Sequence, residues 1–206
     1  MSLLRWVPHR GTLPPLPPLE PGGPTPVVLL HGLMGSPGNF GATAQALLDC
    51  GAPVVAPLYG ERGTVGVEKS FRELLDATAS LPTFDIVGHS LGGYLGLRLA
   101  AERPGTVRTL VGVGACFRGL PLPPRRLVRR AVPLVMGRGA GDLMTATPFP
   151  AAIPEGTRVV SLVSDGDTIV PAASASLGEV RPLRGVLHEH LPAQASAIID
   201  ALEWTP

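Results

Sequence analysis

The pentad Gly88-His89-Ser90-Leu91-Gly92 places a serine between two glycines, directly after a short apolar run and before a stretch rich in small and apolar residues. This pattern is typical of a sharp turn from a strand into a helix, in which the flanking glycines avoid clashes with neighbouring backbone. Such a turn holds the serine hydroxyl at the carboxyl end of a sheet, where open α/β folds bind ligands. Ser90 is therefore the predicted nucleophile of an acyl transfer, and Gly88, His89 and Gly92 complete its elbow.

A serine hydroxyl is a weak nucleophile near neutral pH and needs an adjacent base, which in turn needs an acid to orient it. The expected chain order is serine, acid, histidine. Of the five histidines, only His188 and His190 follow the expected acid. His188 would close the last strand at the mouth of the site, so it is the predicted base, and His190 remains its alternative.

The candidate acid follows a buried apolar run, from which a carboxylate can reach a histidine arriving from the next strand. Asp167 is the predicted acid because the apolar Ile169-Val170-Pro171 that follows would anchor it. Asp165 competes for the role, but it is expected to close the turn by accepting backbone hydrogen bonds. Asp142 is a weaker third candidate.

Acyl transfer also needs hydrogen-bond donors at the place where negative charge develops, and losing one donor costs on the order of 100- to 1000-fold in rate. The loop His31-Gly32-Leu33-Met34-Gly35-Ser36-Pro37 follows the first apolar run. The backbone N–H groups of Leu33 and Leu91 are the predicted oxyanion hole. His31 and Gly32 belong to the same oxyanion loop, and His31 is expected to fix the loop rather than to act as a base.

Strands and helices must alternate along the chain to position these groups. Short apolar runs predict strands at 27–31, 53–57, 84–88, 107–113 and 157–163, with a weaker strand ending at His188. Helical spacing or small-residue packing predicts helices near 40–50, 67–81, 90–101 and 193–204. This alternation indicates an α/β fold with a mostly parallel central sheet of about six strands and helices on both faces.

Two segments break the alternation. Residues 1–26 form a proline-rich N-terminal arm, and residues 27–206 form the domain. Within it, an insert at about 117–156 is too long for an ordinary loop and is the predicted cap or lid, with a helix near 125–136. The four arginines of that helix (125, 126, 129 and 130) favour a solvated basic face, with an anionic substrate group or a lipid surface as the alternative.

These motifs, in this order, resemble the α/β-hydrolase superfamily and, within it, small bacterial lipases and esterases. The resemblance spans nearly the whole chain after Pro26 and implies the α/β-hydrolase fold, with a pocket under the insert. It also implies hydrolysis of carboxylic esters through an acyl-enzyme intermediate, with no cofactor. The sequence departs from the family at Leu187, which stands where a glycine commonly precedes the catalytic histidine.

Other functions fit the same machinery. A thioesterase, amidase or peptidase would use the same residues, because a triad does not choose the leaving group. An epoxide or haloalkane hydrolase is disfavoured, since those relatives carry an aspartate at the position of Ser90. A non-catalytic, hydrolase-like ligand-binding protein is the alternative from another class.

Composition limits the partners. With 206 residues, 45% of them hydrophobic, the chain should bury one core. Only 16% of residues are charged and the formal net charge is +1, which favours a small-molecule ester or acyl substrate over nucleic acid. No apolar run reaches the ~18 residues of a membrane span and no signal peptide is apparent, so a cytoplasmic location is expected. No metal or cofactor motif is found, Cys50 and Cys116 are expected to be buried or semi-buried, and no oligomeric state is indicated.

Overall fold

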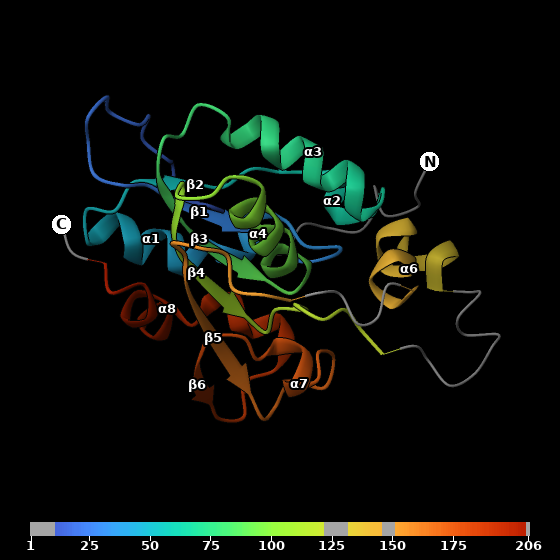
Figure 1. Cartoon of the computed structure of the whole chain (residues 1–206). Coiled ribbons are helices and arrows are strands. Elements are labelled where there is room, and N and C mark those ends of the chain that lie inside the picture. Colours follow the sequence, from blue (N-terminus) through green and yellow to red (C-terminus); the bar gives the residue numbers. More distant parts are fainter. Residues whose placement is uncertain (1–10, 122–131, 146–150, 205–206) are drawn as a thin grey trace.

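The computed structural model describes residues 11–121, 132–145 and 151–204. Its centre is a sheet of six parallel strands in the order β2-β1-β3-β4-β5-β6, which confirms the predicted α/β class (Figure 1). The strands are β1 (Val27–Leu30), β2 (Val54–Val55), β3 (Phe84–His89), β4 (Val107–Val113), β5 (Arg158–Ser164) and β6 (Glu179–Leu183).

Both faces of the sheet are covered by helices, which explains why the strands read as continuous apolar runs. In β1, Val28 and Leu30 belong to one core cluster, whereas Val27 and Leu29 belong to the other, because successive side chains of a strand point to opposite faces. Helices α3 (Val67–Thr78) and α4 (Leu91–Glu102) contribute to the first cluster, and α1 (Gly41–Asp49) and α8 (Ala195–Leu202) to the second. Figure 1 shows these two layers.

The last strand departs from its prediction. β6 ends at Leu183, and His188 is instead the first residue of a 3-10 helix, η3 (His188–Ala193). β6 is the edge strand of the sheet, where Pro182 removes one backbone donor, and Gly185 with φ +67° turns the chain away. The predicted strand ending at His188 is therefore wrong in extent, because the chain leaves the sheet before it reaches the histidine.

The described part of the insert contains a helix that the sequence did not indicate, α6 (Arg138–Thr145). Its Leu143 is buried, and its Asp142 accepts a hydrogen bond from the Val67 N–H at the start of α3 at 2.9 Å. Of the helix predicted near 125–136, residues 132–136 are helical, while 122–131, with the four arginines, lie outside the described residues.

Two short helical segments and the arm complete the description. The segments are α2 (Gly60–Gly63) and α7 (Ala172–Ala175), and a 3-10 turn, η2 (Pro37–Phe40), precedes α1. Residues 11–26 contain neither helix nor strand, although Leu13 and Leu16 pack against the core cluster of α1 and α8. In Figure 1 the dark-blue part of the arm, residues 17–26, and α6 lie at opposite ends of the sheet, whereas Gly11 and Thr12 lie against η2 and the start of α1.

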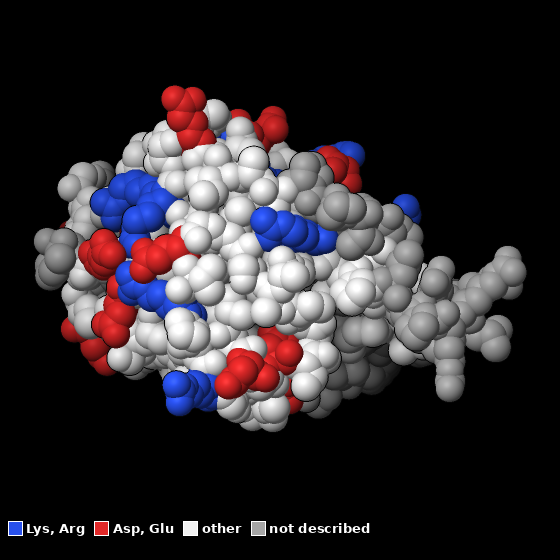
Figure 2. All heavy atoms as spheres, turned by 60° about the horizontal axis from the view of Figure 1, so that its bottom comes forward, with Lys and Arg blue, Asp and Glu red and all other residues white. Residues whose placement is uncertain are grey.

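On the face shown in Figure 2, charged side chains of both signs are mixed among the described residues. Figure 2 shows acidic and basic side chains lying beside one another at one end of the displayed face, next to a wide uncharged area. Near the sheet edge, Arg158 and Arg181 each pair with both Glu179 and Glu203, at 2.6 to 3.7 Å. In this cluster the opposite charges largely offset one another.

The cysteines differ from each other. Cys116 is fully buried, as expected, but Cys50 is exposed. The expectation for Cys50 is wrong because the residue follows the last turn of α1, which ends at the surface. In the described residues no helix is long and apolar enough to cross a membrane, and no cluster of three or more histidine, cysteine or acidic side chains could hold a metal ion.

Candidate active site

Ser90 occupies a strained turn between β3 and α4. Its φ of +53° and ψ of −118° are unfavourable for a residue with a side chain. The turn is held by the backbone: the Ser90 N–H donates to Val113 at 3.3 Å, and the Ser90 carbonyl accepts from Gly93 and Cys116, each at 3.1 Å. Strain of this kind persists only where the surrounding structure imposes it, as at many functional sites.

The glycines of the elbow are required by close approach. A Cβ atom on Gly92 would collide with the carbonyl oxygen of Leu30, and one on Gly88 would lie 2.5 Å from Cα of Gly93. Helix α4 therefore begins in direct contact with the end of β1. This agrees with the strand-turn-helix geometry that the pentad predicted.

Asp167 and His188 form a directly bonded pair. Asp167 Oδ2 lies 2.7 Å from Nδ1 of His188, and Oδ1 accepts the N–H groups of Ile169 at 2.8 Å and Val170 at 2.9 Å. Burial acts to raise the pKa of Asp167, but the hydrogen bonds from His188 and the two backbone groups outweigh it, so the pKa lies below its usual value. An ionised Asp167 can only accept a hydrogen bond, so Nδ1 of His188 carries the proton and donates it into this bond, and Nε2 is the unprotonated nitrogen.

The pair lies beside the serine. A Cβ atom on Gly114 would be 2.8 Å from Oδ2 of Asp167 and 3.3 Å from Nδ1 of His188. Gly114 directly follows Val113, the residue whose carbonyl accepts the Ser90 N–H. Ser90, Asp167 and His188 therefore lie at the same end of the sheet, after the carboxyl ends of β3, β5 and β6, although they are far apart in the sequence.

The three residues that were alternatives for the acid and the base make other contacts in the structure. Asp165 is exposed and accepts the Gly185 N–H at 2.6 Å. This bond joins the loop after β5 to the loop after β6. His190 is exposed and its N–H donates to the Leu187 carbonyl within η3. Asp142 binds the start of α3. None of the three takes part in the Asp167–His188 pair.

His89 is closer to the site than its place in the elbow suggested. Its Nε2 lies 3.0 Å from the carbonyl oxygen of His188, and the two imidazole rings are 4.5 Å apart. Burial, and next the neighbouring His188, lower the pKa of His89 to about 3. A neutral ring with Nε2–H therefore donates to the His188 backbone. Sequence reasoning treated His89 only as a turn residue, because no local pattern indicates a contact across 99 positions.

The oxyanion loop passes over the serine. A Cβ atom on Gly32 would be 3.0 Å from the Cβ of Ser90 and 2.9 Å from Nδ1 of His89. Within the backbone described here, the N–H groups of Leu33 and Leu91 donate to no carbonyl in the loops and caps. Neither donor is used by such a bond, which is compatible with the predicted oxyanion hole.

His31 is a buried part of the loop framework. Its Nδ1 lies 2.9 Å from the Gly32 carbonyl oxygen, and its ring stacks on Tyr59 with centroids 4.1 Å apart. The Tyr59 hydroxyl donates to the His31 carbonyl. These contacts agree with a loop-fixing role for His31.

Cys116 lies next to the serine but is not a competing nucleophile. Its N–H donates to the Ser90 carbonyl, and burial raises the pKa of its thiol to about 12. Since the thiolate is the reactive form, Cys116 is inert near neutral pH.

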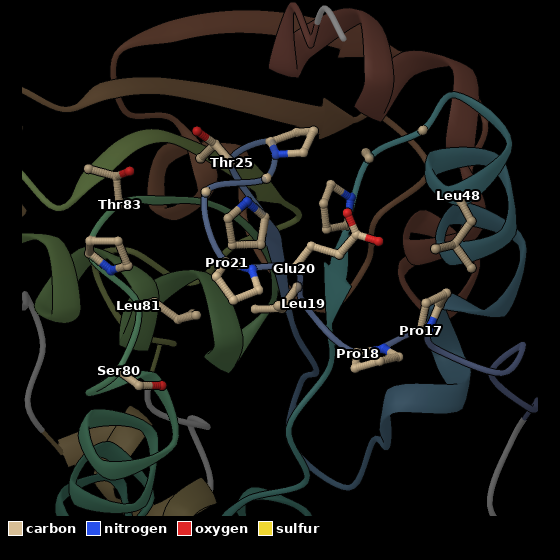
Figure 3. Close-up of a pocket in the computed structure, with 18 residues that line it drawn as sticks. Pro17, Pro18, Leu19, Glu20, Pro21, Thr25, Leu48, Ser80, Leu81 and Thr83 are labelled. Carbon is tan, nitrogen blue, oxygen red and sulfur yellow. The ribbon is translucent and has the colours of Figure 1, made fainter.

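A hollow of about 680 Å³ lies away from Ser90, Asp167 and His188 (Figure 3). It is lined by residues 17–26 of the arm and by residues 51–53 and 80–83, which precede β2 and β3. These are the amino ends of the strands, whereas Ser90 follows the carboxyl end of β3. The length of the sheet thus separates the hollow from the serine.

Comparison with known proteins identifies the family. The model of the alpha/beta hydrolase family matches residues 27–204. The chain belongs to the alpha/beta hydrolase family. The predicted resemblance to this family is thereby confirmed.

The curated and structural relatives are hydrolases. The protein named "Putative carbamate hydrolase RutD" of Variovorax paradoxus is 37% identical over 102 residues, covering 43% of this chain and 37% of the relative. Matches to Escherichia coli sequences of the same name reach 52% of their length, so the chain spans between about a third and a half of these relatives.

Two solved structures share the fold at low identity. The monoacylglycerol lipase of Paleococcus ferrophilus has a TM-score of 0.65 at 20% identity, covering 86% of this chain and 93% of the other. A structure from work on carboxylesterases of Nitrososphaera gargenis has a TM-score of 0.62 at 20% identity, covering 87% and 88%. The chain is thus a hydrolase-family protein with esterase and lipase structural neighbours.

Proposed function

We propose that this protein is a serine hydrolase that cleaves carboxylic esters through an acyl-enzyme intermediate. The observation that carries the proposal is the Asp167–His188 hydrogen bond of 2.7 Å, at the same end of the sheet as the strained Ser90 turn. Donors on both oxygens of Asp167 favour its ionised form, and its bond to Nδ1 leaves Nε2 of His188 free to act as the base.

In the acylation step, Nε2 of His188 takes the Ser90 proton as Oγ bonds to the ester carbonyl carbon. Asp167 stabilises the imidazolium, and the N–H groups of Leu33 and Leu91 bind the oxyanion. The bond from the carbonyl carbon to the alkoxy oxygen then breaks, and the leaving alcohol takes the proton from His188. Water, deprotonated by His188, attacks the acyl-enzyme, and Ser90 regains its proton as the acid leaves.

The experiment is hydrolysis of p-nitrophenyl acetate, butyrate, octanoate and palmitate by the purified protein. The matched variants are Ser90→Ala and Ser80→Ala, since Ser80 is exposed and lines the hollow at the other end of the sheet. Turnover that disappears in Ser90→Ala and persists in Ser80→Ala supports the proposal. Equal turnover in both variants refutes the serine mechanism.

Carbamate hydrolysis is the second candidate, favoured by the name of the curated relatives at up to 37% identity. A carbamate carbonyl would undergo the same attack by Ser90, so the machinery does not distinguish the two. Ethyl carbamate, followed by ammonia release, separates them: Ser90-dependent ammonia release without ester turnover would replace the ester assignment.

A further inference from the structure

Helix α2 is a single turn of left-handed helix. Its residues Gly60, Glu61, Arg62 and Gly63 have φ values of +60°, +44°, +68° and +76°. This conformation suits the two glycines but is costly for Glu61 and Arg62, which have Cβ atoms. Strain at two adjacent residues requires contacts that maintain it.

The neighbouring elements hold the turn in place. The Gly60 N–H donates to the Glu73 carboxylate of α3 at 2.6 Å. On its other side, the Gly139 N–H of α6 donates to the Thr64 carbonyl at 3.2 Å. The turn is therefore anchored between α3 and α6.

The turn presents Arg62 to the oxyanion loop. The Arg62 guanidinium donates to the carbonyl of Met34 and, through Nε, to that of Gly35 at 3.3 Å. In return, the Met34 N–H donates to the Arg62 carbonyl at 2.8 Å. Met34 itself has φ +60°. The loop therefore bends at the residue whose carbonyl and N–H are both hydrogen-bonded to Arg62.

These bonds contribute to the direction of the Leu33 N–H, together with the contact of His31 Nδ1 to the Gly32 carbonyl oxygen at 2.9 Å. A trans peptide is planar, with its N–H and C=O directed oppositely. Holding the Met34 carbonyl orients the Gly35 N–H, and the Gly35 N–H donates to the Gly32 carbonyl at 3.0 Å. Holding the Gly32 carbonyl in turn directs the Leu33 N–H to the opposite side of its peptide plane.

The turn also packs directly on both proposed donors. A Cβ atom on Gly63 would be 2.8 Å from Cδ2 of Leu91 and 3.5 Å from Cα of Leu33. No room therefore remains for the loop to move toward the turn. The guanidinium bonds of Arg62 to Met34 and Gly35 end on carbonyls of the oxyanion loop rather than on the strands of the sheet.

We propose that Arg62 is a positioning residue. Its hydrogen bonds to the Met34 and Gly35 carbonyls orient the Leu33 N–H toward the oxyanion. This inference rests on the proposed serine hydrolase function. Arg62 should therefore stabilise the transition state, in which the oxyanion forms, and not the bound neutral substrate.

The test compares Arg62→Gln and Arg62→Lys with Arg72→Gln, which removes an exposed arginine of the neighbouring α3. We measure kcat, KM and melting temperature with the preferred p-nitrophenyl ester. We also measure the Ki of a trifluoromethyl ketone, whose carbonyl becomes an oxyanion when Ser90 adds to it. A merely structural role would lower the melting temperature or raise KM, but would not single out the oxyanion.

In Arg62→Gln we expect kcat to fall roughly 10- to 100-fold, less than for outright loss of a donor, with KM nearly unchanged. Ki should rise by the same factor as kcat falls. Arg62→Lys, which keeps one charged donor, should lie between wild type and Arg62→Gln, and Arg72→Gln should match wild type.

If Arg62→Gln does not fold, Arg62→Lys carries the test: parallel changes in kcat and Ki support the proposal, and wild-type values overturn it. Wild-type kcat and Ki in folded Arg62→Gln also overturn it. If the wild type itself shows no Ser90-dependent turnover, the proposed function fails first, and the role of Arg62 fails with it.

Discussion

The buried His89 should make the folded protein sensitive to acid. In the unfolded chain its imidazole binds a proton near the ordinary pKa of about 6.5, whereas in the folded protein its pKa is lowered to about 3. Between these values the unfolded state holds the proton and the folded state does not, so this contribution to stability falls as the pH falls.

The magnitude follows from the two pKa values. Lowering the pH from 7 to 5 should cost about 2 kcal/mol of unfolding free energy through His89 alone, and lowering it to 4 about 3 kcal/mol. Asp167, whose pKa is lowered, adds stability above the ordinary carboxyl pKa of about 4 and loses it only below that pH. The interval from pH 7 to 5 therefore excludes the contribution of Asp167, and comparison with a variant at position 89 separates His89 from the other histidines.

Urea unfolding followed by circular dichroism at pH 7, 6 and 5 measures this dependence. The variant is His89→Gln, whose side-chain N–H can replace the donor to the His188 carbonyl but does not titrate. His190→Gln, at an exposed position in η3, is the matched control. We expect His89→Gln to lose about 2 kcal/mol less than wild type over this interval, and His190→Gln to follow wild type. Identical pH dependence in wild type and His89→Gln would refute the reasoning.

Three further predictions follow from the site. Asp167→Asn should lower kcat roughly 1000- to 10,000-fold, because an amide favours the wrong tautomer of the imidazole, whereas Asp165→Asn should keep nearly wild-type turnover; a comparable loss in both would contradict the assignment. Gly92→Ala should lower the unfolding free energy by about 2 to 4 kcal/mol, because its methyl group meets the carbonyl at the end of β1; an unchanged urea midpoint would argue against that contact. Iodoacetamide at pH 8 should label Cys50 and leave Cys116 unmodified in the native protein, because the pKa of the buried Cys116 thiol is raised to about 12. Mass spectrometry of the digested protein measures the labelling of each cysteine. Early labelling of Cys116 would contradict its burial.

The amino ends of the strands offer a contrast to the active-site end. The hollow there is lined largely by prolines of the arm and by Leu48 and Leu81, with Glu20 as its one charged lining residue (Figure 3). Ser90, Asp167 and His188 all lie at the other end. In a parallel sheet the carboxyl ends share one edge, so strand direction alone brings these loops together.

Local patterns in the sequence were sufficient for the fold and for the serine. Apolar runs of four to seven residues, separated by helical spacing, predict a doubly covered parallel sheet, because only strands buried on both faces are apolar throughout. The elbow around Ser90 is equally local, since its strand, turn and helix are continuous in the chain. The family match over residues 27–204 confirms the fold class, whereas the role of Ser90 as nucleophile stays a prediction.

Contacts between distant segments required the tertiary structure. The two candidate acids, Asp165 and Asp167, are two residues apart, and so are the two candidate bases, His188 and His190. Local sequence therefore cannot determine which acid bonds to which histidine. The 2.7 Å bond of Asp167 to His188 depends on how two loops approach each other. Composition likewise does not predict that Arg62 reaches a loop 28 residues earlier in the chain. The physical reason is that strand and helix formation depends on neighbours along the chain, whereas the orientation of a hydrogen-bonding group depends on which segments the sheet brings together.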